Sequence, residues 1–248
     1  MKKEIIRAEN LTREFIVGNE VVHALRGVDF SIQEGEFVTI MGTSGSGKST
    51  LLNLLGCLDT PTTGDYYLDG ISVRTMNKNE RATLRNRKIG FIFQSYNLLA
   101  KTTAIDNVQL PLMYNPEISA KERYERSVRA LNEVGLSERL THKPNQLSGG
   151  QQQRVAIARA LVNEPVIILA DEATGNLDTR TSFEIITLLQ RLNTEEGRTI
   201  VFVTHNPEMA EYCSRNIVLR DGRILSDTFN NNVRSAKETL DSLPKEND

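Results

Sequence analysis

Eight consecutive residues have the types and the spacing of a phosphate-binding loop. In order they are Gly42, Thr43, Ser44, Gly45, Ser46, Gly47, Lys48 and Ser49, and they match the pattern G-x-x-x-x-G-K-[ST]. The glycines let backbone N–H groups turn toward a polyanion, because residues without a Cβ adopt the dihedral angles that such a loop requires. The Lys48 ammonium is suited to bind the outer phosphates, and the Ser49 hydroxyl is suited to ligate Mg²⁺. The loop therefore predicts a nucleotide site.

The residues around this loop predict the strand and the helix that the motif requires. A buried strand is expected at 37–41, and a helix is expected from Thr50 to Leu55. The positive end of that helix would face the phosphates, so we count Thr50 among the nucleotide-binding residues. A glycine-rich surface turn is the alternative, and the eight-residue match in this setting disfavours it.

Two carboxylates follow a second predicted strand, at 166–170. An acidic residue at the end of a buried strand beside a phosphate loop can hold Mg²⁺, because this ion prefers hard oxygen ligands. The adjacent carboxylate can orient and polarise an attacking water. We therefore predict a metal-holding role for Asp171 and a catalytic role for Glu172. A solvated turn is the alternative, and the phosphate loop upstream argues against it.

A serine and two glycines at a predicted helix start form a third motif, which we call the signature segment. It consists of Leu147, Ser148, Gly149, Gly150 and Gln151. Backbone N–H groups at a helix start bind anions, but one chain has no second phosphate for them to hold. The simplest arrangement is a head-to-tail pair of chains, in which each signature segment covers the nucleotide of the partner.

The composition is that of an ordinary soluble protein. The chain has 248 residues, of which 39% are hydrophobic and 25% are charged, and its formal net charge is −2. This charge gives no general attraction to nucleic acid. The apolar run at 166–170 is far shorter than the roughly 20 residues that cross a bilayer. We therefore expect a cytoplasmic protein whose membrane role is peripheral, with Cys57 and Cys213 as reduced packing residues.

The predicted elements change in kind along the chain. Strands dominate the first part, helical signals dominate residues 95–163, and strands alternate with helices in the last part. Buried strands that alternate with helices predict an α/β fold with a parallel sheet. Residues 1–229 are expected to form one domain, and residues 230–248 a polar, mobile tail.

Together these motifs resemble those of the ATP-binding subunits of ABC transporters, over residues 5–226. The resemblance implies the ABC type of phosphate-loop NTPase fold. Such a domain has a mixed or parallel core sheet, an N-terminal antiparallel β subdomain and a helical signature subdomain. It also implies ATP hydrolysis with Mg²⁺, a homodimer, and a separate transmembrane permease subunit, with no nucleic acid partner.

The resemblance assigns further residues one at a time. Gln94 would sense the γ-phosphate and Mg²⁺, and His205 would contact the γ-phosphate. Asp178 would connect the two subunits, while Ser148 and Gly150 would reach the ATP that the opposite chain holds.

Two positions depart from the usual pattern of the family. Phe15 stands where the family places an aromatic residue that stacks on adenine, although tyrosine is more common there. A core role for Phe15 remains the alternative. Ala173 replaces a proline that would fix φ after the catalytic acid, which predicts slightly lower rigidity and retained hydrolysis.

Several segments resemble one branch of the family, the ATPases of macrolide-export, lipoprotein-release and cell-division complexes of bacterial inner membranes. These segments lie at 56–59, 89–94, 110–114 and 151–154. The branch implies export or extraction of a substrate, from the cytoplasmic face of the inner membrane. A regulatory mechanotransmitter that moves no cargo is the open alternative. The residues after Gln94, from Tyr96 to Tyr114, would receive a helix of the membrane subunit, or form core.

Other classes with the same ATP site fit less well. Chromosome-structuring and DNA-repair relatives place a long coiled coil between the nucleotide motifs, and translation factors carry two cassettes. Lys48 and Asp171 are too close in sequence for the coiled coil, and only one cassette is present. A small-molecule kinase would have no use for the signature segment.

Overall fold

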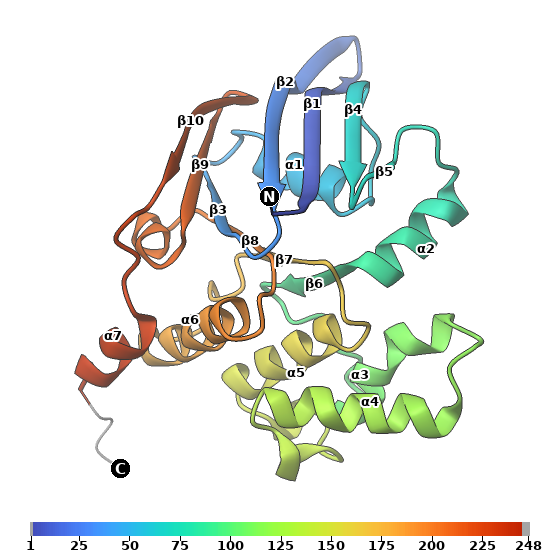
Figure 1. The fold of residues 1–248 in the computed structure, drawn as a ribbon, viewed down its shortest axis with the longest axis vertical. Coiled ribbons are helices and arrows are strands. Elements are labelled where there is room, and N and C mark those ends of the chain that lie inside the picture. The colour runs from blue at the N-terminus through green and yellow to red at the C-terminus, as the bar shows by residue number, and fades with distance from the viewer. Residues whose placement is uncertain (1, 245–248) are drawn as a thin grey trace.

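The computed structural model describes residues 2–244, whose strands form two sheets (Figure 1). The first sheet is antiparallel, with the order β2-β1-β4-β5. Its strands are β1 (Glu4–Val17), β2 (Glu20–Gln33), β4 (Thr63–Leu68) and β5 (Ile71–Ser72).

The second sheet, the core sheet, has the order β10-β9-β3-β8-β7-β6. Its five parallel strands are β3 (Phe37–Met41), β6 (Ile89–Phe93), β7 (Ile167–Asp171), β8 (Ile200–Thr204) and β9 (Arg215–Arg220). The edge strand β10 (Arg223–Phe229) pairs antiparallel to β9 through the turn at Asp221 and Gly222. The sheet is therefore mixed.

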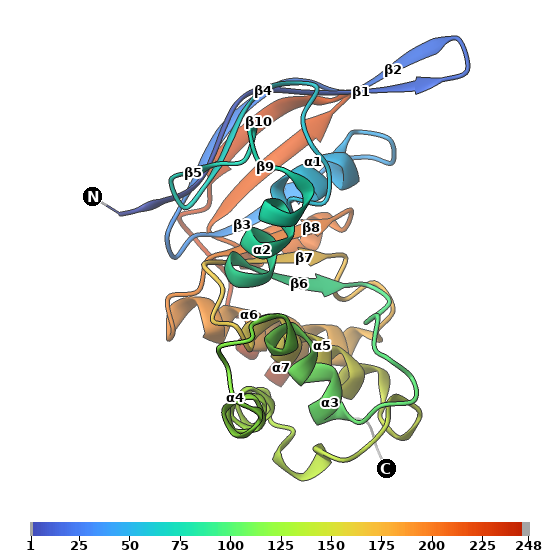
Figure 2. The same cartoon turned by 90° about the vertical axis from the view of Figure 1, so that its right-hand side faces the viewer.

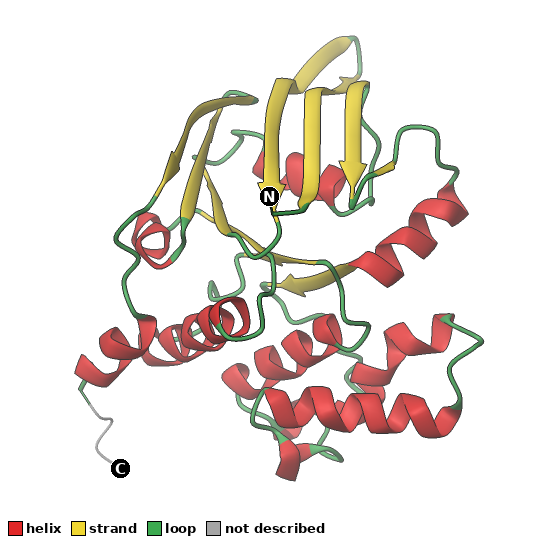
Figure 3. Ribbon diagram, viewed as in Figure 1, coloured by secondary structure: helices red, strands yellow, loops and turns green. Residues whose placement is uncertain are grey.

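Most helices lie on the opposite side of the core sheet from the antiparallel sheet, as the red elements of Figure 3 show. The α-helices are α1 (Lys48–Leu55), α2 (Lys78–Lys88), α3 (Ala104–Gln109), α4 (Ala120–Glu133), α5 (Gly149–Leu161), α6 (Thr179–Thr194) and α7 (Ala236–Ser242). The 3₁₀ helices are η1 (Leu110–Tyr114), η2 (Ser137–Arg139), η3 (Pro144–Gln146) and η4 (Pro207–Tyr212). The expected α/β fold with its antiparallel β subdomain and helical subdomain is confirmed.

The core sheet is buried on both faces because its residues alternate between two hydrophobic clusters. Along β7, Ile168 and Ala170 belong to the cluster shared with α5 and α6. Ile167 and Leu169 belong to the cluster shared with α1 and the antiparallel sheet. Burial on both faces explains the nearly continuous apolar run that marks this strand in the sequence.

The helical layer is built on α5. This helix contacts β6 of the core sheet on one side and α3 and α4 on the other. In Figure 2, α3 and α4 lie farthest from the antiparallel sheet. Helix α4 begins at the Ser119 N-cap, whose side chain accepts a hydrogen bond from the Glu122 N–H, and Gly135 follows with φ +76°.

The sequence analysis missed two helices. Helix α2 buries only Leu84, so it has no apolar stripe; its one signal is the capping box of Asn77 with Glu80. Helix α7 lies within the segment expected to be a mobile tail. Its Ala236 is fully buried, and the Ala236 N–H donates to Gln190 Oε1 of α6 at 2.8 Å. Residues 245–248 of the expected tail lie outside the described residues.

Two further expectations concern cysteines and membrane spans. Cys57 and Cys213 are both buried and free, in agreement with packing roles. Burial raises the pKa of the Cys57 thiol to about 11. Within residues 2–244, no helix has the length and apolar character needed to cross a bilayer.

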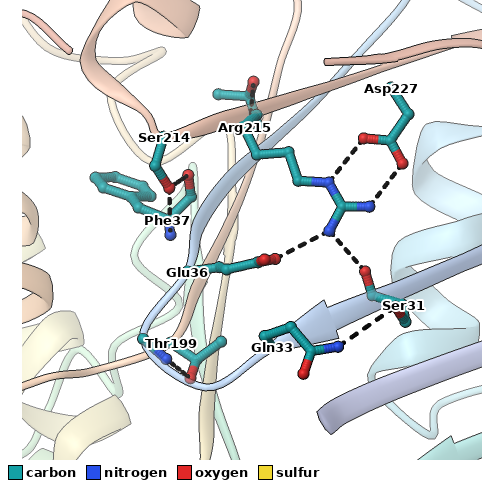
Figure 4. A network of polar contacts seen from close by, with 10 residues as sticks. Ser31, Gln33, Glu36, Phe37, Thr199, Ser214, Arg215 and Asp227 are labelled. Atoms are coloured by element: carbon teal, nitrogen blue, oxygen red, sulfur yellow. Dashed lines mark hydrogen bonds and ion pairs between the residues drawn. The ribbon is translucent and has the colours of Figure 1, made fainter. Parts of the chain in front are cut away.

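One arginine joins the core sheet to the antiparallel sheet (Figure 4). Arg215 of β9 donates Nε and Nη2 to the two carboxylate oxygens of Asp227 on β10, at 2.7 and 2.6 Å. Its Nη1 donates to Glu36 Oε2 at 3.0 Å and to the carbonyl of Ser31 on β2 at 2.8 Å. These charged partners raise the pKa of Arg215, and its side chain is only 9% exposed. The network fixes the start of β3, which leads to the phosphate loop.

We expect Arg215→Met to lower the free energy of unfolding by about 3 kcal/mol, because it leaves the largely buried Glu36 carboxylate and the partly exposed Asp227 carboxylate without their cation. Urea unfolding of purified protein measures this loss. Arg234→Met is the matched control: Arg234 pairs with Glu211 at a site where both side chains are half exposed, so its loss should stay below about 1 kcal/mol. Equal losses for both variants would contradict the bridging role of Arg215.

Candidate active site

The phosphate loop connects β3 to α1, and two of its glycines are required by close packing. A Cβ added at Gly42 would lie 2.3 Å from the Leu219 carbonyl oxygen. A Cβ added at Gly47 would lie 2.6 Å from the Ala24 carbonyl oxygen, and its φ of +103° also favours glycine. The loop is therefore held between β2 and the end of β9.

The loop has the polar groups that a polyphosphate needs. Helix α1 begins at Lys48 with Gly47 as its N-cap, so no side chain caps its first N–H groups. Lys48 Nζ donates to the carbonyls of Gly42 and Thr43 at 2.7 and 2.8 Å, which places the ammonium over the loop. Ser46 Oγ is buried and has no hydrogen-bond partner among the described residues. These open donors fit bound phosphate groups.

The predicted catalytic residues meet at one edge of the core sheet, where the parallel strands end. Asp171 closes β7 and pairs with Phe93 of β6, so Gln94 follows at the same edge. His205 follows the last residue of β8. Burial raises the pKa of Asp171, and the neighbouring Glu172 carboxylate adds to this, while Lys48 opposes it. The Lys48 ammonium therefore lies near enough to influence the Asp171 carboxylate.

Glu172 is fixed by an unusual backbone conformation and by one side-chain contact. Its φ is +45°, which is uncommon for a residue with a side chain, and its N–H donates to the Val203 carbonyl at 2.9 Å. Glu172 Oε1 lies 2.8 Å from His205 Nδ1. The imidazole thus holds one carboxylate oxygen and leaves the other available to a water molecule.

Gln94 is joined to the loop that follows Glu172. Gln94 Nε2 donates to Asn176 Oδ1 at 3.2 Å, and Asn176 Nδ2 donates to the Gln94 carbonyl at 3.1 Å. A Cβ added at Gly175 would lie 2.5 Å from Gln94 Nε2, so a side chain at this position would displace the Gln94 amide. The sequence analysis gave Asn176 no role, although its amide pairs with Gln94 across a long sequence separation.

Asp178 caps α6. Its Oδ1 accepts the Thr181 N–H at 2.8 Å and its Oδ2 accepts the Thr181 hydroxyl at 2.5 Å. The bond from the Thr181 hydroxyl, followed by the backbone N–H, lowers the pKa of Asp178. Within one chain its contacts are therefore local, and a contact with a second chain would be additional to them.

The signature segment begins α5. Ser148 is the N-cap and forms a capping box with Gln151. The nearest atom to a Cβ added at Gly149 would be Tyr96 Oη, at 3.0 Å. The nearest atom to a Cβ added at Gly150 would be Thr181 Cγ2, at 2.5 Å. Helices α5 and α1 pack on opposite faces of the core sheet (Figure 1). The structure thus gathers the phosphate loop, Gln94, Asp171, Glu172 and His205, but it does not bring the signature segment to the phosphate loop.

Phe15 is 37% exposed and belongs to neither hydrophobic cluster, so the alternative of a core role does not fit. It pairs with Val22 of β2, two residues before Ala24, whose carbonyl packs against Gly47. Phe15 therefore lies two strand positions along β2 from the contact with the phosphate loop.

The sequence analysis also missed Arg159 of α5, which holds the loop after Gln94. Arg159 Nη1 donates to the Asn97 carbonyl at 2.6 Å and Nη2 donates to the Tyr96 carbonyl at 2.7 Å. Both of these loop residues have positive φ, +57° for Tyr96 and +51° for Asn97. No sequence pattern predicts these long-range hydrogen bonds from Arg159 to a strained loop.

The donors at the site suit a cation that phosphate oxygens help to bind. Among residues 2–244, no group of three or more His, Cys, Asp or Glu residues could hold a metal ion. The Ser49 hydroxyl, the Gln94 amide and the Asp171 carboxylate are the hard oxygen ligands that this edge offers. They fit Mg²⁺ brought with a nucleotide, and they do not form a complete protein cage.

A phosphate loop, a carboxylate pair and a histidine at the carboxyl edge of a parallel sheet define a nucleoside triphosphate hydrolase domain. Residues 25–175 match a family model described as ABC transporter. The chain belongs to this family, and it is an ATP-binding, ATP-hydrolysing cassette.

Known relatives support this assignment over most of the chain. An ABC transporter ATP-binding protein of Thermotoga maritima is 54% identical over 90% of this chain and 94% of that protein. The macrolide export ATP-binding/permease protein MacB of Brucella melitensis is 50% identical over 95% of this chain, which spans 36% of that protein. The dimeric structure of the cassette MJ0796 of Methanocaldococcus jannaschii is 49% identical, with a TM-score of 0.82, and 91% and 98% of the two chains are covered.

We expect Ala173→Pro to stabilise the protein by up to about 1 kcal/mol and to retain ATP hydrolysis. The φ of Ala173 is not positive, and its N–H donates no hydrogen bond within residues 2–244, so proline removes none. Its carbonyl would still accept the bond from Gln153 Nε2. Thermal unfolding and steady-state turnover of the variant check this. Unchanged stability and rate would contradict a loosened turn, and a clear loss would show that the buried site has no room for the ring.

Proposed function

We propose that this chain is the ATP-hydrolysing subunit of a bacterial inner-membrane ABC transporter. Two copies pair head to tail around two ATP molecules and drive a separate membrane subunit, for export or for extraction of a lipoprotein or similar substrate. The observation that carries this proposal is the exposed Ser148 at the start of α5, whose segment contacts Tyr96 and Thr181 instead of its own phosphate loop. A related cassette forms dimers, one of them bound to ADP and Pi.

In the proposed reaction each residue at the sheet edge has one task. Lys48 and the loop N–H groups bind the outer phosphates. Glu172 accepts a proton from the attacking water with the carboxylate oxygen that His205 leaves free. Mg²⁺, held by Ser49, Gln94 and Asp171, would neutralise charge on the phosphates.

The partner's signature segment would complete the site. Its Ser148, Gly149, Gly150 and Gln151 present the N-terminal end of α5 to the γ-phosphate that the first chain holds. Asp178 and His205 lie near the same edge and would meet the second chain there. Because closure depends on contacts to the γ-phosphate from both chains, hydrolysis removes a contact that only the closed pair makes, and the pair reopens.

A groove between the helical layer and the core sheet would receive the membrane subunit. It is a cavity of about 620 Å³ formed by α2, β6, η1 and α5. Its lining includes Phe91 and Phe93, together with Arg85, Arg87 and Arg159, and it contains no carboxylate. Such a groove fits an amphipathic segment that carries an acidic group.

The residues after Gln94 divide between core and groove. Ile105 and Leu112 are buried in the core. Tyr114 of η1 lines the groove and is 80% exposed, and the preceding Met113 is 62% exposed. This exposure on the proposed membrane-facing side supports a peripheral position at the cytoplasmic face of the inner membrane.

Glu172→Gln should slow ATP turnover by about 10²- to 10⁴-fold while ATP binding is preserved, because the amide cannot take the proton. Turnover and the dissociation constant of ATP are measured on the same preparation. Glu208→Gln is the matched control, since Glu208 lines the same small cavity beside Glu172 and His205 but has no predicted role. Wild-type-like turnover in Glu172→Gln would remove Glu172 from the base role.

The membrane assignment is tested with tagged Glu172→Gln protein that is held with ATP and Mg²⁺ and mixed with solubilised membranes. We expect recovery of a polytopic protein with a large extracytoplasmic domain, and a loss of at least tenfold when Tyr114→Ala is added. Leu225→Ala controls for nonspecific hydrophobic binding. Leu225 is similarly exposed, at 62%, but lies on β10 away from the groove. Recovery of ribosomes or DNA-bound proteins alone would refute the transporter role and leave the ATP site intact.

A further inference from the structure

An arginine stacks against the ring of Phe15, and none of the predicted roles uses it. The guanidinium carbon of Arg13 lies 4.5 Å from the ring centroid of Phe15. Arg13 Nε also donates to Asp59 Oδ2 at 2.8 Å, and Asp59 Oδ1 accepts the Thr60 N–H at 2.7 Å. Both charged side chains are about one quarter exposed, so the pair is partly shielded from solvent.

The strand register shows that Arg13 and Phe15 lie on the face of the antiparallel sheet that covers the phosphate loop. Arg13 pairs with Leu25 of β2, and Leu25 is fully buried against Gly47. The register shifts between Arg13 and Glu14, and the contact of the Arg13 guanidinium with the Phe15 ring places both side chains on this same face.

The neighbouring strands place the anchor of Arg13 and the phosphate loop on opposite sides of β1. Strand β1 lies between β2 and β4. Asp59 is on the β4 side, because the Thr62 N–H donates to the Thr12 carbonyl at 2.8 Å. The phosphate loop is on the β2 side, where Gly47 packs against Ala24. The Asp59 anchor of Arg13 thus lies on one side of strand β1, and the phosphate loop lies on the other.

We infer that Arg13, anchored by Asp59, is a positioning residue for the adenine of ATP. The guanidinium supports one face of the Phe15 ring and leaves the opposite face for the base. This deepens the nucleotide site and rests on the proposed adenine contact of Phe15. The support matters for a phenylalanine, which has no hydroxyl with which to anchor its own ring.

Loss of the Arg13 guanidinium should change the Michaelis constant for ATP. Arg13→Ala should raise the KM for ATP about fivefold with little change in kcat, because the guanidinium touches the ring and not the phosphates. Arg13→Lys should give an intermediate KM, since lysine keeps the bond to Asp59 but stacks less well than a planar guanidinium. Asp59→Asn should raise the KM in the same direction.

Inorganic tripolyphosphate separates positioning from damage to the phosphate loop. It has no base, so its inhibition constant against ATP hydrolysis should stay the same in Arg13→Ala. Arg7→Ala is the matched control on the same strand, because the Arg7 guanidinium covers the Tyr67 ring at 4.1 Å, and this variant should keep the wild-type KM and kcat.

Phe15→Ala is measured in parallel, so that the base contact of Phe15 and the positioning role of Arg13 can be refuted independently. If Phe15→Ala raises the KM for ATP and Arg13→Ala does not, the positioning role of Arg13 is refuted and the base contact stands. If neither variant changes the KM, the base contact and the inference fall together. If Arg13→Ala weakens ATP and tripolyphosphate equally, Arg13 supports the loop and not the base.

Discussion

The site depends on one constraint, the burial of a parallel sheet on both of its faces. Parallel strands end at the same edge, so the residues that follow β6, β7 and β8 must lie close together. Gln94, Asp171 and His205 come from segments far apart in the chain and meet there for this reason. The Arg215 network acts on the same sheet, because it fixes the entry to β3, and the phosphate loop follows β3 directly.

The core sheet also separates the phosphate loop from the signature segment of the same chain. The phosphate loop and α1 pack on one face, while α5 with its Ser148 N-cap packs on the other. A single chain therefore carries the phosphate loop and the Asp171-Glu172 pair but cannot cover them with its own signature segment. This geometry favours association of two copies. ATP bound at their junction would be contacted by both copies, and these contacts would stabilise the closed pair.

The sequence predicts those parts of the fold whose signals are local. Strand 37–41 with its loop, the N-cap at Ser148 and the Asp221-Gly222 turn each follow from residue types and spacing. Helix α2 has no apolar stripe and helix α7 has only seven residues, so the N-cap residues Asn77 and Ser235 are their main local signals. The positive φ of Glu172 and its contact with His205 depend on where the strands end, and no sequence window contains that information.

Helix α5 connects the two surfaces on which the proposed function depends. Its first turn carries Ser148, which would meet the partner's ATP, and its last turns carry Arg159. Arg159 holds the carbonyls of Tyr96 and Asn97, two strained residues that follow Gln94 and lead into the groove. A helix is stiff along its axis, and close-packed elements shift between discrete arrangements. In the proposed function, a displacement of α5 by the partner's nucleotide would therefore move the loop of Gln94 and the groove together, and this would couple ATP-driven closure to the membrane subunit.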